Sequence, residues 1–151
     1  MKQATLMIAM LVSITANATP VAEMKKRTAI DEAVAKAAEN TKDCGKKFTI
    51  AFDWKAFDSI DWDGIKRKKD DYYGTEHSNV VDIGAGLNQV CADKDYKAAL
   101  AKINKVTYRT TNDDKIRVKA VINGDTMILD NYSFGSTRGA DDYATAVKAA
   151  L

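Results

Sequence analysis

The chain has very little histidine, and this shortage limits the catalytic chemistry that it can perform. His77 is the single histidine in 151 residues. One histidine cannot form a multi-histidine metal site, and it supplies at most one histidine base. A Ser-His-acid triad would also need a nucleophilic serine, and the sequence has no Gly-x-Ser-x-Gly motif to present one. We therefore expect no catalytic residues and no enzyme activity, and we interpret His77 as a surface or capping residue.

Motifs for cofactors and metals are also scarce. Gly84-Ala85-Gly86 is followed by no third glycine or lysine at the spacing of a phosphate-binding loop, so we expect no cofactor. The segment Ser59-Ile60-Asp61-Trp62-Asp63-Gly64, with Asp70 at position twelve, partly matches a calcium loop. A serine at position one and the adjoining run Lys66-Arg67-Lys68-Lys69 count against calcium. We expect a turn and no metal there, although the sequence leaves calcium open.

Only two cysteines are present, Cys44 and Cys91. In an exported chain, a pair of cysteines is first interpreted as one disulfide. Two distant cysteines and one histidine do not have the ligand spacing of a zinc site. Closing a loop of about 48 residues stabilises the fold by roughly 4 kcal/mol in the chain-entropy treatment. We therefore predict a Cys44–Cys91 disulfide.

The chain contains no apolar run long enough to span a bilayer comfortably, which takes about 20 residues. Its one apolar run is at the N-terminus, where Lys2 precedes a short hydrophobic stretch that ends at Ala16-Asn17-Ala18. These three parts are typical of a secretory signal peptide. We predict cleavage after Ala18 and a periplasmic or secreted mature protein. Residues 1–18 are thus the signal peptide, and residues 19–151 are one disulfide-linked domain.

A strong excess of charge of either sign is absent as well. Residues 1–18 carry one basic residue and no acid, so of the 23 Lys and Arg residues 22 remain in the mature chain, against 21 Asp and Glu. Proteins that bind nucleic acid usually have a marked basic bias. The near-neutral balance therefore argues against a nucleic-acid partner.

Hydrophobic periodicity predicts both helices and strands. Three- and four-residue spacing predicts helices over 21–40, 78–92, 93–103 and 140–151. Alternation predicts a strand over 47–53 and a three-strand meander in the C-terminal third. The predicted fold class is α+β, with one antiparallel sheet of about four strands and helices packed on one face.

The dipeptide Asn123-Gly124 predicts a type I′ hairpin turn, because both residues tolerate positive φ. This turn would place Val118 opposite Leu129, Ala120 opposite Met127, and Arg117 opposite Asp130. Earlier in the chain, Gly84 and Gly86 interrupt a predicted helix. Because glycine lowers helix stability, we expect a packing reason for them, namely a close approach of another backbone.

Residues 54–73 combine aromatic side chains with charges of both signs. Tyrosine, tryptophan and arginine are enriched at protein interfaces. We therefore predict that the protein works without catalysis by binding another protein, for example as an inhibitor or immunity-type protein of the bacterial envelope. The predicted interface residues are Trp54, Trp62, Lys66, Arg67, Tyr72 and Tyr73.

Two other functions remain open at the level of sequence. The carboxylates of Asp53, Asp58, Asp61 and Asp63 lie among aromatic residues, a composition found in clefts that bind or cleave carbohydrates. A third possibility is a small-ligand carrier with an apolar cavity between sheet and helices. Two carboxylates converging in a pocket would favour the carbohydrate hypothesis, whereas an exposed patch of tryptophan and tyrosine would favour protein binding.

Overall fold

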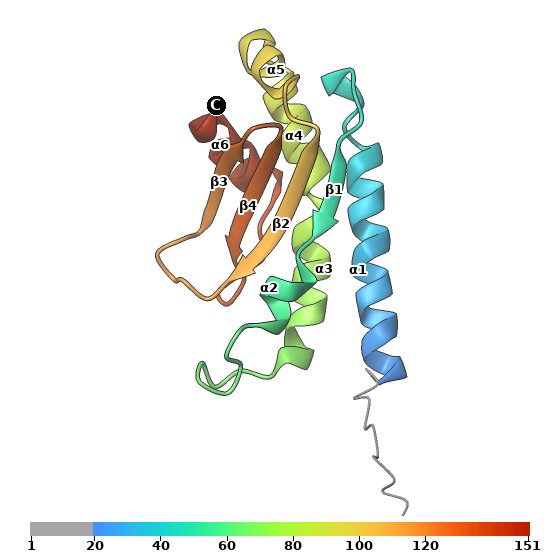
Figure 1. Cartoon of the computed structure of the whole chain (residues 1–151), viewed down its shortest axis with the longest axis vertical. Coiled ribbons are helices and arrows are strands. Elements are labelled where there is room, and N and C mark those ends of the chain that lie inside the picture. The colour runs from blue at the N-terminus through green and yellow to red at the C-terminus, as the bar shows by residue number, and fades with distance from the viewer. Residues whose placement is uncertain (1–19) are drawn as a thin grey trace, which may run out of the picture.

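The computed structural model describes residues 20–151 (Figure 1). The predicted signal peptide and its cleavage site therefore lie outside the described residues. A four-stranded sheet and a set of helices enclose one hydrophobic core. In the view of Figure 1, α3, α4 and α6 lie behind the sheet, and α1 runs alongside β1. The predicted α+β class is confirmed.

The elements follow one another in the order expected from the periodicity, but the chain forms six α-helices where four were predicted. The helices are α1 (Val21–Glu39), α2 (Trp54–Asp58), α3 (Tyr72–Val81), α4 (Ile83–Cys91), α5 (Lys94–Leu100) and α6 (Ala140–Ala150). The strands are β1 (Thr49–Phe52), β2 (Lys105–Thr111), β3 (Val118–Asn123) and β4 (Thr126–Tyr132). Short 3₁₀ turns occupy Lys42–Cys44 (η1) and Lys69–Asp71 (η2).

The predicted helix over 78–92 is in fact two helices, α3 and α4, which meet at Asp82. Helix α3 begins at Tyr72, six residues before the predicted start at Ser78, whose hydroxyl donates to the carbonyl oxygen of Gly74 within the helix. His77 likewise lies exposed inside α3 and not at a helix start. The aromatic start of α3 has little apolar periodicity, and for this reason the sequence pattern missed it.

The sheet is mixed, so the prediction of an antiparallel sheet was wrong. The strand order is β1-β2-β4-β3, with β1 parallel to β2, β2 parallel to β4, and β3 antiparallel to β4. The chain between β1 and β2 contains four helices, and a helical crossover of this kind normally joins parallel strands. The predicted three-strand meander is also wrong, because β4, and not β3, pairs with β2. Apolar and polar residues alternate in both strands of the hairpin, so the sequence pattern could not determine which of the two strands pairs with β2.

The β3–β4 hairpin exists, but its register differs from the prediction by two residues. Asn123 pairs with Thr126, and Ala120 pairs with Leu129, which makes Gly124-Asp125 the turn. Only Gly124 has positive φ, at 61°, as in a type II′ turn with glycine first. The predicted pairing of Arg117 with Asp130 is therefore wrong. Instead, Arg117 forms an ion pair with Asp142, and Arg109 forms one with Asp130.

Close helix packing explains the two glycines of α4. A Cβ added at Gly84 would lie 2.1 Å from the carbonyl oxygen of Ala37 in α1. A Cβ added at Gly86 would lie 2.7 Å from the Cβ of Tyr143 and 2.8 Å from the carbonyl oxygen of Ala140, both in α6. The predicted close approach of other backbones is therefore confirmed, and α4 is the central helix of the layer.

The predicted disulfide is also confirmed. Cys44 in η1 and Cys91 at the end of α4 are bonded and buried, and their Cα atoms are 5.0 Å apart. The bond ties the segment before β1 to the central helix. Among residues 20–151, no helix is both long and apolar enough to span a membrane.

Candidate functional site

The aromatic residues of the segment 54–73 pack mainly inward. Tyr72 is 9% exposed and Tyr73 is 4% exposed, while Trp54 and Trp62 are half-buried. Trp54 packs on Phe52 with ring centroids 4.3 Å apart, and its indole nitrogen donates to Asp31 in α1. Most of the aromatic surface predicted to bind a partner is therefore used to attach this segment to the core.

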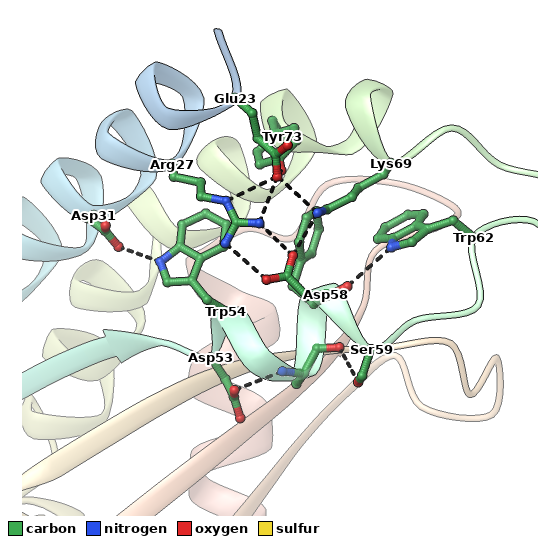
Figure 2. A network of polar contacts seen from close by, with 12 residues as sticks. Glu23, Arg27, Asp31, Asp53, Trp54, Asp58, Ser59, Trp62, Lys69 and Tyr73 are labelled. Atoms are coloured by element: carbon green, nitrogen blue, oxygen red, sulfur yellow. Dashed lines mark hydrogen bonds and ion pairs between the residues drawn. The ribbon is translucent and has the colours of Figure 1, made fainter. Parts of the chain in front are cut away.

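Next to these rings lies a cluster of charged side chains that joins α1 to the segment 54–73 (Figure 2). We call it the ionic clasp, and its members are Glu23, Arg27, Asp58, Lys69 and Tyr73. Arg27 pairs with Asp58 at 2.6 Å and with Glu23 at 2.8 Å. Lys69 pairs with the same two carboxylates, at 2.7 Å and 3.0 Å. The Tyr73 hydroxyl donates to Glu23 at 2.6 Å.

The clasp shifts the pKa values of its two carboxylates in the direction that holds them charged and that of Tyr73 in the direction that holds it neutral. Hydrogen bonds from Tyr73, Arg27 and Lys69 lower the pKa of Glu23 to about 2. Partial burial acts to raise the pKa of Asp58, but hydrogen bonds from Arg27 and Lys69 outweigh it, so this pKa lies below its usual range. Burial and the bond to Glu23 raise the pKa of Tyr73 to about 12. Because two cations neutralise two carboxylates, the clasp is a structural element with satisfied charges.

The four aspartates proposed for carbohydrate chemistry lie in different local settings. Asp53 caps α2 by accepting from the backbone N–H of Ala56, and Asp58 belongs to the ionic clasp. Asp61 accepts from the backbone N–H of Gly64, and Asp63 is exposed. With three of the four carboxylates already bonded to protein partners, the geometry does not favour the carbohydrate hypothesis.

The partial calcium motif is folded as a turn. The Ser59 hydroxyl donates to the carbonyl oxygen of Ala56, and Asp70 pairs with Lys26 of α1. Within the described part of the chain, no group of three or more His, Cys, Asp or Glu side chains is arranged to hold a metal ion.

Two adjoining grooves form the most prominent concave surface built from the predicted interface. The first has a volume of about 450 Å³ and the second about 300 Å³. They share Tyr72 and Thr75 of α3, so we treat them together as the two-loop groove. One wall is the loop 66–68 with Asp71, and the other is the loop after β4. The lining residues are Lys66, Arg67, Lys68, Asp71, Tyr72, Thr75, Ser133, Phe134, Gly135, Ser136 and Thr137.

The first wall is held in place by its own backbone hydrogen bonds. Arg67 donates its N–H to the carbonyl oxygen of Trp62, and Lys66 donates to that of Asp63. Lys66 has φ of 54°, and it is the one non-glycine with positive φ among residues 20–151. Such a conformation costs energy for a residue with a Cβ, and strained residues of this kind cluster at functional sites. The loop therefore holds the backbone of three adjacent basic residues in a defined geometry.

A row of aromatic rings connects the two walls beneath the groove. Trp62 packs on Tyr72 and on Phe134, with centroid distances of 5.5 and 5.7 Å. Tyr72 and Phe134 are 4.8 Å apart, and Phe134 also meets Tyr132 at 5.3 Å. Edge-to-face and tilted pairs at these distances are favourable. The row fixes the loop after β4 against the loop after α2, although the two are about seventy residues apart in sequence.

The structure thus divides the predicted interface residues into two groups. Lys66, Arg67 and Tyr72 line the two-loop groove, and Trp62 packs below it. Trp54 and Tyr73 instead pack against each other next to α1, at the ionic clasp. The sequence reasoning missed the residues from the second wall. Ser133 to Thr137 carry no motif, and only the tertiary contact of Phe134 with Trp62 brings them to the groove.

A buried polar network behind the second wall was also missed. Glu76 of α3 is fully buried, accepting from Tyr108 at 2.5 Å and from Thr110 at 2.9 Å. Asn131 donates to the hydroxyls of Tyr108 and Ser133, which lie 2.6 and 2.8 Å away. Burial raises the pKa of Glu76 despite the hydrogen bonds that lower it. Glu76 could have been noticed from its position on the inward face of a helix, had α3 been placed correctly.

Comparison with known proteins does not assign this chain to a family. No protein-family model, curated protein or solved structure matches the chain. The function has to be inferred from the two-loop groove and its charges.

Proposed function

We propose that this protein is an exported, non-catalytic binding protein that recognises an acidic segment of another protein in the two-loop groove. The observation that carries the proposal is the basic first wall. Lys66, Arg67 and Lys68 are exposed, and none of them forms an ion pair with any of the residues 20–151. The neighbouring Lys69, by contrast, is fully engaged in the ionic clasp.

The other features of the groove suit a peptide ligand. The hydroxyl groups of Ser136 and Thr137 lie on the opposite wall, and that of Thr75 in α3 lies where the two grooves join, so all three can donate to or accept from a peptide backbone. The half-buried Phe134 supplies apolar contact area. Interface anchors are commonly such aromatic residues, with arginine beside them. Asp71 is the one acidic side chain on the rim, so the net charge of the groove is positive.

Preorganisation supports binding over a purely structural role for the loop. A loop that is already bonded internally loses less conformational entropy when a partner binds. Opposite charges at the rim would mainly raise the association rate and make it sensitive to salt. We therefore expect a partner whose contact surface is acidic, bound more weakly as the ionic strength rises.

The test is a pull-down from envelope and culture fractions with the mature protein as bait. The variant Lys66→Glu/Arg67→Glu/Lys68→Glu reverses the charge of the groove. The control Lys94→Glu/Lys102→Glu/Lys115→Glu makes the same change in net charge at exposed positions elsewhere. We expect a stoichiometric partner to be retained by the wild type and the control, lost from the groove variant, and displaced by a polyglutamate peptide.

Retention by the groove variant would contradict the proposal, as would equal loss from the groove variant and the control. The fold and the disulfide of each variant are checked beforehand by circular dichroism and thiol titration. A partner displaced by uncharged peptide as readily as by polyglutamate would also contradict recognition of acidic residues.

A further inference from the structure

The outer edge of β3 is an open end of both the sheet and the core. β3 is the last strand in the order β1-β2-β4-β3, and it has a strand neighbour on one side only. Helix α6 packs against β3, and at the opposite end of the sheet α1 packs against β1, so the unpaired feature of β3 is its outer backbone edge. In Figure 1 no other strand lies beyond β3, and α6 reaches this end of the sheet from behind. Native proteins usually protect such edges, because unpaired strand groups recruit other strands.

The hairpin geometry identifies the backbone groups that are left over. The hairpin closes with Asn123 opposite Thr126. In a two-residue hairpin the closing pair is hydrogen-bonded, and bonded pairs then alternate along the ladder. Asn123, Val121 and Lys119 thus bond to β4, while Val118, Ala120 and Ile122 direct their N–H and C=O groups outward. Within residues 20–151, these outward groups take part in no backbone hydrogen bond outside the hairpin.

The same three residues also carry the incomplete part of the core. Val118, Ala120 and Ile122 are half-buried and pack against the core cluster from its edge. Their core-facing neighbours in β4 include Met127 and Leu129, which are fully buried. An added strand would therefore satisfy the outward backbone groups and cover half-exposed apolar side chains at once.

We propose that the occupant of this edge is a second copy of the chain, with the two β3 strands antiparallel about a two-fold axis at Ala120. Antiparallel partners must share a sheet face, so each copy's Val118 lies opposite Ile122 of the other, and Ala120 lies opposite itself. All core-side pairs are then apolar. The outward groups of three residues on each strand form six hydrogen bonds, and the sheet becomes an eight-stranded sheet across the dimer.

The exposed face of the sheet is compatible with this register. Lys119 of one copy lies beside Val121 of the other, so the two Lys119 ammonium groups are not directly opposed. Like charges placed directly opposite each other would destabilise the pair. The lysine stem can cover Val121, which is 40% exposed in the single chain. A two-fold axis at Lys119 would instead oppose the two lysines, and an axis at Val121 would form fewer hydrogen bonds.

The proposal is tested first by the oligomeric state of the mature protein, measured by sedimentation equilibrium. We expect the wild type to be a dimer at micromolar concentration. Ala120→Pro removes an outward N–H, and proline is tolerated on an edge strand where its missing N–H faces solvent. This variant should keep its fold. The dissociation constant of its dimer should rise at least about tenfold, because backbone hydrogen bonds across the interface are lost. Val81→Thr, at an exposed valine at the end of α3 outside the proposed interface, is the control and should remain dimeric.

Disulfide trapping tests the register and does not depend on the fold of the proline variant. A mixture of Lys119→Cys and Val121→Cys proteins should form a cross-linked heterodimer under mild oxidation, because these positions face each other across the axis. Each single variant alone should remain uncross-linked, since equivalent residues are then too far apart for a disulfide. The native disulfide is buried and should not exchange.

Three results would overturn the proposal. The first is a monomeric wild type throughout the micromolar range. The second is a dimer that Ala120→Pro leaves intact while the variant is folded. The third is cross-linking of Val121→Cys alone or of no combination, which would place the axis elsewhere or remove β3 from the interface. The groove variant of the previous section should still dimerise, so the two proposals fail independently.

Discussion

Gly84 and Gly86 show how strongly single residues constrain the helix packing. Both glycines are buried in α4, and each position is approached closely by the backbone of a different helix. Glycine in a helix interior is normally unfavourable relative to alanine by about 1 kcal/mol. At these positions a Cβ has no room, so the usual preference is reversed.

We expect Gly84→Ala to lower the free energy of unfolding by about 1–3 kcal/mol, because the carbonyl of Ala37 cannot move away without displacing α1. Gly74→Ala is the matched control. Gly74 lies in α3, and a Cβ there would meet nothing within 4 Å. This control should raise the free energy of unfolding by about 0.5–1 kcal/mol. Urea denaturation of both variants measures the effect, and equal changes in the two would refute the packing argument.

At the scale of elements, the ionic clasp determines how α1 meets the segment 54–73. Glu23 and Arg27 stand one turn apart on α1, and they contact Asp58 at the end of α2 and Lys69 in η2 (Figure 2). The clasp holds the base of the loop that carries the basic wall of the two-loop groove. Its charges are paired within the protein, so its contribution is to position the groove and not to bind the partner.

The clasp predicts a loss of stability in acid. The pKa of Glu23 is about 2 in the folded protein, below its ordinary value of 4.5. A lowered folded-state pKa contributes stability above the unfolded value, and this contribution is lost as the pH falls from 4.5 towards 2. Glu23→Gln should therefore be less stable than the wild type at pH 7, by on the order of 1 kcal/mol given the partial exposure. The difference should close as the pH falls to 2.

Chemical denaturation at several pH values between 7 and 2 measures this difference. Glu32→Gln is the control, since Glu32 is an exposed residue of the same helix. If the difference in free energy of unfolding between Glu23→Gln and wild type stays constant over this range, the charge of the Glu23 carboxylate does not contribute to stability.

At the scale of the whole molecule, the helical layer and the sheet are joined by polar as well as apolar contacts. Glu76 of α3 reaches Tyr108 and Thr110 of β2 in a fully buried network. Asn131 and Ser133 extend this network to β4 and the second wall of the groove. A buried carboxyl is costly to ionise, because the charged form loses its hydration.

The raised pKa of Glu76 gives the opposite pH dependence to that of Glu23. A raised folded-state pKa contributes stability below the unfolded value of about 4.5, and this contribution is lost as the pH rises through the folded value. Relative to the wild type, Glu76→Gln should therefore gain stability as the pH rises from 4.5 to 8, by on the order of 1 kcal/mol or more.

Thermal unfolding of both proteins across this pH range checks the sign. Glu39→Gln, which changes an exposed acid at the end of α1, serves as the control. A difference between Glu76→Gln and wild type that shrinks with rising pH would mean that the network stabilises the carboxylate more than burial destabilises it.

Much of the local structure was predictable because it depends on neighbouring residues. The helical spacing of α1 and α6, the alternation in β2 to β4, and the presence of a hairpin turn at Gly124 follow from short-range patterns, whereas the predicted type I′ turn and its register were wrong. The Cys44–Cys91 bond followed from there being only two cysteines, and the crowding at Gly84 and Gly86 followed from the cost of glycine in a helix. Each of these inferences needs only the sequence and one physical rule.

The remaining features depend on contacts between residues that are distant in sequence, so only the tertiary structure decided them. Both hairpin strands had suitable faces, and packing placed β4 rather than β3 beside β2. Trp54 and Tyr73 are residue types enriched at interfaces, yet their contacts with α1 leave Trp54 half-buried and Tyr73 buried. The two-loop groove exists because Phe134 packs edge-to-face on Trp62, and the open β3 edge exists because the chain leaves that strand outermost. Sequence patterns record which side chains can pack, whereas the balance among long-range contacts determines which of them do.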